Sequence, residues 1–141
     1  MTIILGLMAA VLLITYSIYF VKIIQGRPQE FELNLSNALQ NWLQESKPTA
    51  LWKLLWASVL LEVIYFGLVF ITVSNPVTLA MTVLIIVVET WHLLVVTINT
   101  RNFFAGRISS TGIFNWKLER ISALGFFTHS LIVLLTLLWL T

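Results

Sequence analysis

Four ionisable side chains lie inside long apolar stretches of this sequence: Glu62, Glu89, His92 and His129. An ionisable group inside a membrane span costs about 2.5–3.5 kcal/mol on insertion scales, and such groups usually mark a functional site. A carboxyl group at that depth is protonated, paired with an imidazolium or bound to a metal ion. The residue types therefore predict a buried site that binds a metal ion or exchanges protons.

The spacing of these residues from the nearest basic side chains predicts one common layer. Glu62 comes nine residues after Lys53, and His92 comes nine residues before Arg101. His129 likewise comes nine residues after Arg120. At 1.5 Å per helical residue, all three lie about 13 Å from the same boundary, and Glu89 lies one turn deeper.

Helical periodicity places each ionisable residue on the most polar stripe of its segment. Steps of three and four residues join Glu89 and His92 to threonines and Asn99, and join His129 to Ser122. Such a stripe is expected to face the other helices rather than lipid. The predicted pocket neighbours are Tyr65, Trp91, Ser58 and Ser17.

Two carboxylates and two imidazoles supply four ligands for a divalent metal ion. Glu89 and His92 form a Glu-x-x-His pair on one helical face, which resembles the half-motif of the di-iron carboxylate bundles. That resemblance implies a second Glu-x-x-His pair, which this sequence lacks. We therefore predict a mononuclear site of Glu62, Glu89, His92 and His129 holding zinc, iron or manganese. A catalytic and a structural role for the metal both remain open.

Three other interpretations explain part of the same pattern. His92 and His129 at equal depth are the pair that a bis-histidine haem needs. Buried carboxyl groups with histidine also suit a small proton-coupled transporter. In an accessory subunit of a larger membrane complex, the same residues would hydrogen-bond helices together.

The elements that position these residues follow from composition. The chain has 141 residues, of which 59% are hydrophobic and 10% charged, with no cysteine. Soluble domains carry about 25% charged residues, so a nucleic-acid-binding domain and a disulfide scaffold are excluded. Four apolar runs are each long enough to cross a bilayer as a helix: 3–22, 54–73, 77–99 and 121–140. We expect a single all-α domain with four transmembrane helices in two antiparallel hairpins.

Charge predicts the orientation of these helices. The basic residues all flank the first and third connections: Lys22, Arg27, Lys47, Lys53, Arg101, Arg107, Lys117 and Arg120. The positive-inside rule makes that side cytoplasmic and puts both termini outside, and we expect the bacterial inner membrane. Residues 33–45 have the pattern of an amphipathic interfacial helix. The expected partners are the lipid bilayer, a lipophilic small molecule such as a quinone, and further subunits in a homo-oligomer or larger complex.

Overall fold

The computed structural model describes residues 2–45, 48–109 and 112–140, and every regular element in these ranges is a helix. Five α-helices follow one another, and the last ends in a π-helical turn. In chain order they are α1 (Thr2–Ile24), α2 (Pro28–Glu45), α3 (Pro48–Thr72), α4 (Pro76–Phe104), α5 (Trp116–Leu135) and the π-helical turn Thr136–Leu140.

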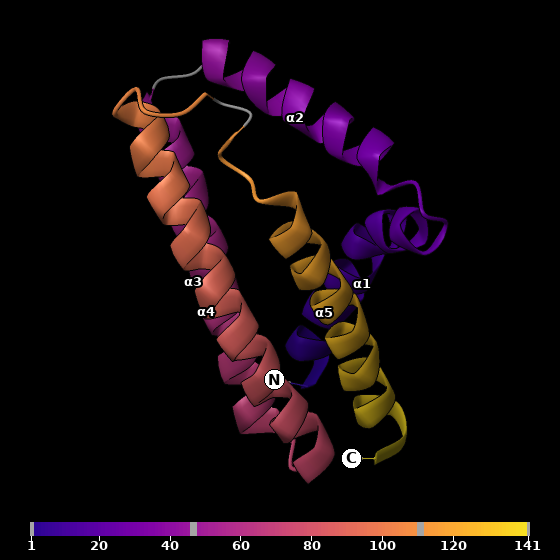
Figure 1. Ribbon diagram of the computed structural model, residues 1–141. Coiled ribbons are helices and arrows are strands. Elements are labelled where there is room, and N and C mark those ends of the chain that lie inside the picture. The colour runs from indigo at the N-terminus through magenta and orange to yellow at the C-terminus, as the bar shows by residue number, and fades with distance from the viewer. Residues whose placement is uncertain (1, 46–47, 110–111, 141) are drawn as a thin grey trace.

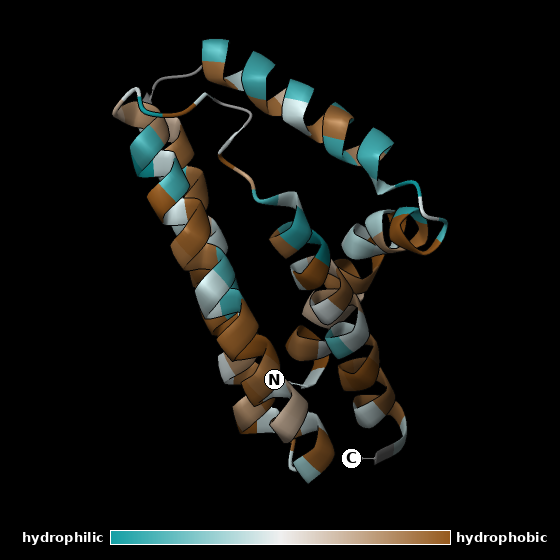
Figure 2. Ribbon diagram, viewed as in Figure 1, coloured by the Kyte–Doolittle hydropathy of each residue, from teal (hydrophilic) through white to brown (hydrophobic). Residues whose placement is uncertain are grey.

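Four of these helices are long and apolar enough to cross a membrane: α1, α3, α4 and α5 with its final turn. Their outward faces carry large hydrophobic side chains such as Ile14, Leu60 and Leu84, each more than half exposed. Figure 2 shows hydrophobic residues along most of the length of these helices, with hydrophilic positions on α2, at the helix ends near it and in a smaller patch midway along α4. The all-helical, four-span prediction is confirmed at this level. α3 and α4 extend beyond the predicted runs, by several residues each, on the side of the basic residues.

Local sequence signals fix the helix ends. The Asn75 side chain accepts hydrogen bonds from the backbone N–H groups of Val77 and Thr78, and Pro76 occupies the first helical position of α4. Gly26 and Gly106 adopt positive φ angles of 72° and 76° just after α1 and α4. Glycine takes this conformation without a steric penalty, so it ends both helices and turns the chain.

The spanning helices form a ring in the order α1, α5, α4, α3, with α3 also touching α1. Figure 1 shows both chain ends and the α3–α4 turn in the lower half, whereas α2 and the α4–α5 connection lie at the top. We call these the terminal end and the basic end. The main partner of α1 is α5, not α3 as sequential hairpins would imply. Stacked aromatic pairs, Phe20 on Phe127 and Tyr16 on Phe126, contribute to this contact.

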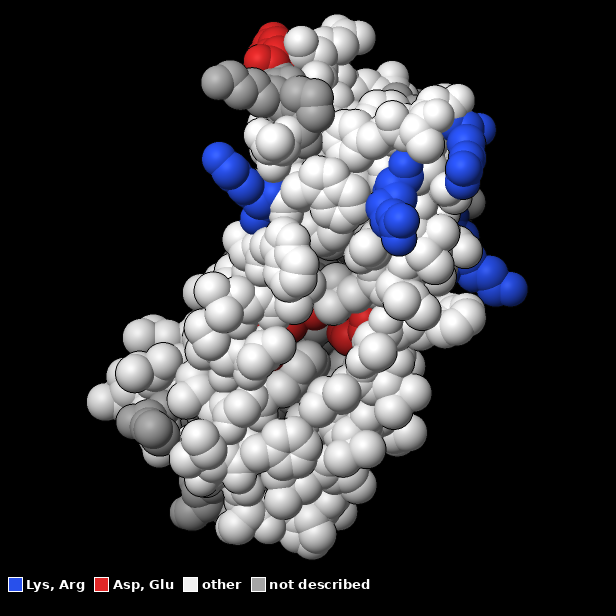
Figure 3. Space-filling view, turned by 90° about the vertical axis from the view of Figure 1, so that its left-hand side faces the viewer, with Lys and Arg blue, Asp and Glu red and all other residues white. Residues whose placement is uncertain are grey.

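Basic side chains gather at the end of the bundle that carries α2. On the face drawn in Figure 3, the Lys and Arg side chains all lie in the upper half of the molecule. Lys47 lies outside the described residues. The charge asymmetry on which the orientation prediction depends is therefore visible in the fold.

Helix α2 is longer than the predicted segment 33–45, and a partly buried ion pair connects its first turns to the bundle. Glu32 is 5% exposed and accepts hydrogen bonds from Arg120 of α5 at 2.6 and 2.7 Å. Tyr19 of α1 donates a third hydrogen bond to Glu32. Burial alone would raise the pKa of Glu32, but these hydrogen bonds and the Arg120 charge outweigh it and lower that pKa. Sequence analysis gave no indication of this contact.

Replacing Glu32 with alanine is expected to destabilise the protein by about 2 kcal/mol, because Arg120 loses a bidentate carboxylate partner. Since folding lowers the pKa of Glu32, its contribution is complete at neutral pH. It is lost as the pH falls through the folded-state pKa, which lies below the ordinary value of a glutamate carboxyl group. Thermal unfolding in detergent measures both effects. The matched control is Glu30→Ala, an exposed glutamate on the same helix, and equal melting temperatures for the two variants would contradict this role of Glu32.

Candidate functional site

The centre of the site is an imidazole held between two carboxyl groups. His92 of α4 contacts Glu89 through Nδ1 at 3.2 Å and Glu119 of α5 through Nε2 at 2.6 Å. The Glu89 side chain is 3% exposed, His92 13% and Glu119 18%. Ser122 of α5 donates a hydrogen bond to the second oxygen of Glu89. We call Glu89, His92 and Glu119 the relay cluster.

Glu62 of α3 joins this cluster from a neighbouring helix. Glu62 and Glu89 line the same small pocket between α3 and α4, and their carboxyl groups lie close enough to interact directly. Three carboxyl groups from three helices therefore surround one imidazole. The predicted convergence of Glu62, Glu89 and His92 is what the structure shows.

His129 lies elsewhere, and its expected place in the same layer needs correction. Its Nδ1 is 2.9 Å from the Tyr65 hydroxyl, and its Nε2 is 2.8 Å from the Thr82 hydroxyl. Both partners are neutral, and His129 is 1% exposed. It belongs to a separate polar network on the terminal side of the relay cluster.

The antiparallel register of α4 and α5 explains this displacement. His92 faces Glu119, Glu89 faces Ser122 and Thr82 faces His129. Residue numbers therefore decrease along α4 by the same amount as they increase along α5. The facing partner of His129 is thus ten residues from His92, or about 15 Å along the helix. The depth prediction treated Arg101 and Arg120 as marks of one boundary. In the observed register, Arg101 and Arg120 lie at different heights along the bundle. The reason is that α4, which ends at Phe104, extends further toward the basic end than α5, which begins at Trp116.

This separation bears on the haem interpretation. Each of the four ring nitrogens of His92 and His129 has a protein partner within 3.2 Å. A haem iron bound by both histidines would have to displace one partner of each and draw together two side chains about 15 Å apart along the bundle.

The predicted pocket neighbours divide into two groups. Tyr65 is buried and touches His129, and Ser58 lines a cavity beside Glu62. Trp91 is 60% exposed on the outer face of α4, so it is not a pocket residue. Ser17 donates its hydroxyl hydrogen bond to Ile14 of its own helix and lines none of the cavities described below. Adjacency to His92 in sequence is misleading for Trp91, because consecutive helical residues point about 100° apart.

Sequence reasoning missed Glu119, which contacts His92 most closely. It precedes the apolar run 121–140, so a search for ionisable residues inside the spans does not reach it. A signal was present: Glu119 is three residues before Ser122, on the same polar stripe of α5. Extending that stripe by one turn would have brought Glu119 into the site.

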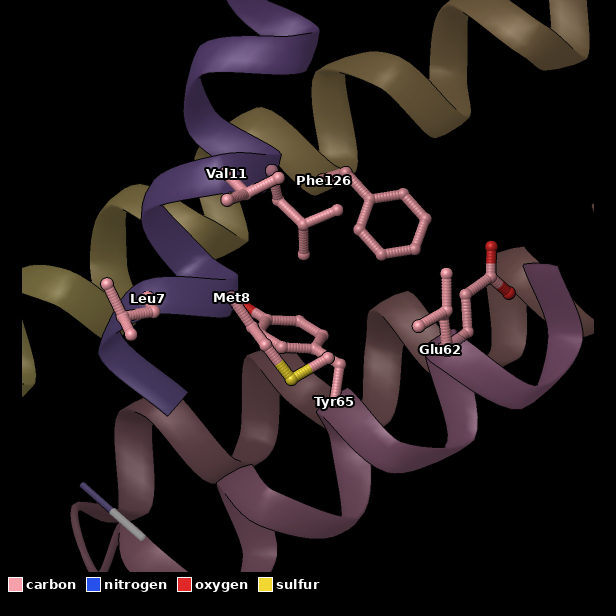
Figure 4. A pocket seen from close by; sticks show the side chains of 8 residues that line it. Leu7, Met8, Val11, Glu62, Tyr65 and Phe126 are labelled. Atoms are coloured by element: carbon pink, nitrogen blue, oxygen red, sulfur yellow. The ribbon is translucent and has the colours of Figure 1, made fainter. Parts of the chain in front are cut away.

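Two cavities lead away from the cluster. One, of about 190 Å³, lies on the basic side and is lined by Tyr16, Ser58, Glu62, His92, Thr100 and Glu119 together with apolar residues that include Ile113 and Phe114. The other, of about 270 Å³, lies between α1 and α3 and is almost entirely apolar. Figure 4 shows Glu62 at its edge, with the carboxyl group directed away from Leu7 and Met8. In Figure 3, acidic side chains are visible at the base of a hollow midway along the molecule.

Within the described ranges, no group of three or more His, Asp or Glu side chains is arranged to hold a metal ion. The geometry of His92 gives the reason. The two ring nitrogens of an imidazole point in divergent directions, and Glu89 and Glu119 lie at opposite nitrogens. One ion bound at either nitrogen would therefore be remote from the carboxyl group at the other.

The chain matches no protein-family model, and no curated protein and no solved structure matches it.

Proposed function

We propose that this chain is a small proton-carrying membrane protein whose relay cluster takes up protons from the basic end of the bundle. The observation that carries the proposal is the placement of His92 between Glu89 and Glu119. An imidazole can accept a proton at one nitrogen and release one from the other. A proton arriving at Glu119 can therefore leave toward Glu89 without any movement of the backbone.

Charge balance supports this proposal. Glu62, Glu89 and Glu119 would carry three negative charges if all were ionised, and an imidazolium at His92 balances only one of them. An unpaired carboxylate is costly in a low-dielectric bundle, so each proton that enters or leaves the cluster changes its charge balance. The three carboxyl groups and His92 are therefore a store of exchangeable protons.

The cavities suggest an entrance and a use for these protons. The cavity on the basic side contains Glu119, His92 and Glu62, and it lies beside Ile113 and Phe114 of the α4–α5 connection. The apolar pocket next to Glu62 has the character of a binding site for a lipophilic molecule. A proton-coupled carrier of such a molecule is the function class that uses both features.

The proposal also includes the orientation of the bundle in the membrane. The gathering of basic residues at one end supports a cytoplasmic basic end with both termini outside, in a bacterial inner membrane. The exposed apolar helix faces suit lipid contact, and they also suit assembly into a homo-oligomer or a role as an accessory subunit.

A divalent metal ion is the second candidate, favoured by the proximity of the Glu62 and Glu89 carboxyl groups from neighbouring helices. In the part of the chain that the structure describes, the side chains as they stand form no such group of three, so an ion would have to draw Glu62, Glu89 and His92 Nδ1 together. Zinc, iron and manganese all accept this combination of ligands.

Reconstitution into liposomes tests the proton function. With a pH-sensitive dye inside and a potassium diffusion potential, vesicles containing the protein are expected to take up protons faster than protein-free vesicles, and a chelator should leave the rate unchanged. Elemental analysis of the same preparation measures bound metal. No uptake above the background would overturn the proposal, and uptake that a chelator abolishes would favour the metal candidate.

A further inference from the structure

A shallow cavity at the basic end of α4 has no part in the proposed proton function. It has a volume of about 360 Å³ and is lined by Ile98, Arg101, Asn102, Ala105 and Arg107. In Figure 1 it lies where α4 meets the α4–α5 connection. Both arginine side chains are exposed, so the cavity is accessible from outside the bundle. We call it the arginine pocket.

The end of α4 brings the two arginines together. α4 ends at Phe104, and Gly106 then adopts a positive φ angle of 76°. This turn lets the Arg107 N–H donate a hydrogen bond to the Asn102 carbonyl at 2.9 Å. The chain is thereby folded back against the last turn of α4, which places Arg107 beside Arg101 and Asn102.

The charges of the arginine pocket are not balanced by neighbouring carboxylates. In the described part of the chain, no acidic side chain lines the pocket, and neither Arg101 nor Arg107 forms an ion pair. Arg120, in contrast, is paired with Glu32. Guanidinium groups bind phosphate through charge-assisted hydrogen bonds, and the Asn102 amide can add a further donor. The pocket therefore has the chemistry of a phosphate site.

An apolar stripe on the outer face of α4 leads to this pocket. Trp91, Leu94 and Ile98 follow helical spacing and are 60%, 51% and 48% exposed. Ile98 also lines the arginine pocket, so the stripe ends directly at the two guanidinium groups. The apolar surface and the cationic surface are thus continuous, which matches a ligand with an acyl chain and an anionic headgroup.

The length of α4 places the arginine pocket at the level of lipid headgroups. Its 29 residues span about 43 Å, whereas the hydrocarbon core of a bilayer is about 30 Å thick. Arg101 comes 25 residues after Pro76, or about 37 Å along the helix axis. With Pro76 at one boundary of the core, Arg101 lies beyond the other boundary, among the phosphate groups, while Trp91 and Leu94 lie among the acyl chains.

We propose that the arginine pocket binds the phosphate group of an anionic phospholipid, whose acyl chain lies along Trp91, Leu94 and Ile98. The inference is independent of the proposed proton-carrying function. Phosphatidylglycerol, whose headgroup adds no positive charge to the phosphate, is a ligand of this class. The choline group of phosphatidylcholine would bring a cation near two unpaired guanidinium groups, so the pocket should discriminate against that lipid.

Native mass spectrometry in detergent tests this site with phosphatidylglycerol and phosphatidylcholine of identical acyl chains. The wild-type protein should bind phosphatidylglycerol at least about tenfold more tightly. The double variant Arg101→Gln, Arg107→Gln should lose this preference and, because both side chains are exposed, should retain the fold. The matched control is Lys22→Gln, Arg27→Gln, which removes two charges at the basic end outside the pocket. This control should bind phosphatidylglycerol as the wild type does.

Three results would overturn the inference. Equal affinity of the wild-type protein for the two lipids would show that the pocket does not select an anionic headgroup. Equal losses in the two double variants would assign lipid binding to the total charge of the basic end. Glycerol 3-phosphate, which has the phosphate group without acyl chains, should bind more weakly than phosphatidylglycerol. Equal affinity for both would make the pocket a site for a soluble phosphate ester rather than a lipid.

Discussion

Replacing Glu89 with glutamine is expected to lower proton uptake by about 100-fold or more, to the level of protein-free vesicles. Removing a positioned acid–base group typically costs about 10²–10⁴ in rate, and Glu89 is the buried carboxyl group that connects His92 to Glu62. Glutamine preserves the size of the side chain and can still accept the Ser122 hydrogen bond. Uptake in reconstituted vesicles under a fixed potassium diffusion potential measures the effect.

The matched control is Glu30→Gln, the same chemical change at an exposed position on α2. It should leave proton uptake at the wild-type rate. If both variants retain full uptake, Glu89 does not carry protons. Equal losses in both would mean that the change in total charge, rather than the relay cluster, controls the rate.

Replacing His92 with alanine is expected to cost roughly 3–5 kcal/mol of stability. The substitution removes the only imidazole between Glu89 and Glu119 and leaves a carboxyl group that is 3% exposed without its partner. Breaking a buried pair by removing one member has a cost of this size. Unfolding in detergent, followed by circular dichroism, measures the difference.

A double variant tests the electrostatic cause of that cost. In His92→Ala with Glu89→Gln, the buried carboxylate is neutralised, so the double variant should be more stable than His92→Ala alone. When two residues interact through their charges, the effects of their substitutions on the free energy of unfolding do not add. Additive losses from the two substitutions would instead assign the cost to lost packing around His92.

Composition and periodicity were sufficient to predict the four spanning helices, because apolar runs of that length have one stable form in lipid. They also predicted that Glu62, Glu89 and His92 would converge, since the polar stripe of each helix faces its neighbours. The pairing of helices was harder to predict. α1 packs mainly on α5 through aromatic stacking, a long-range contact that no local pattern encodes.

The positions of Glu119 and His129 depend on the register between α4 and α5. A shift of this register by a few residues exchanges which α5 side chain meets His92, and sequence periodicity is unchanged by such a shift. The tie between Glu32, Tyr19 and Arg120 likewise joins three helices. Polar contacts that depend on relative helix heights therefore required the structure.

Infrared difference spectroscopy tests most directly whether the relay cluster exchanges protons. Spectra of the reconstituted wild-type protein at two pH values should contain a carboxyl carbonyl band that shifts in D₂O and disappears in Glu89→Gln. An imidazole signal should disappear in His92→Asn, and the spectra of Glu30→Gln should retain both. Wild-type spectra that show no change in carboxyl or imidazole protonation, while the same vesicles take up protons, would contradict the account.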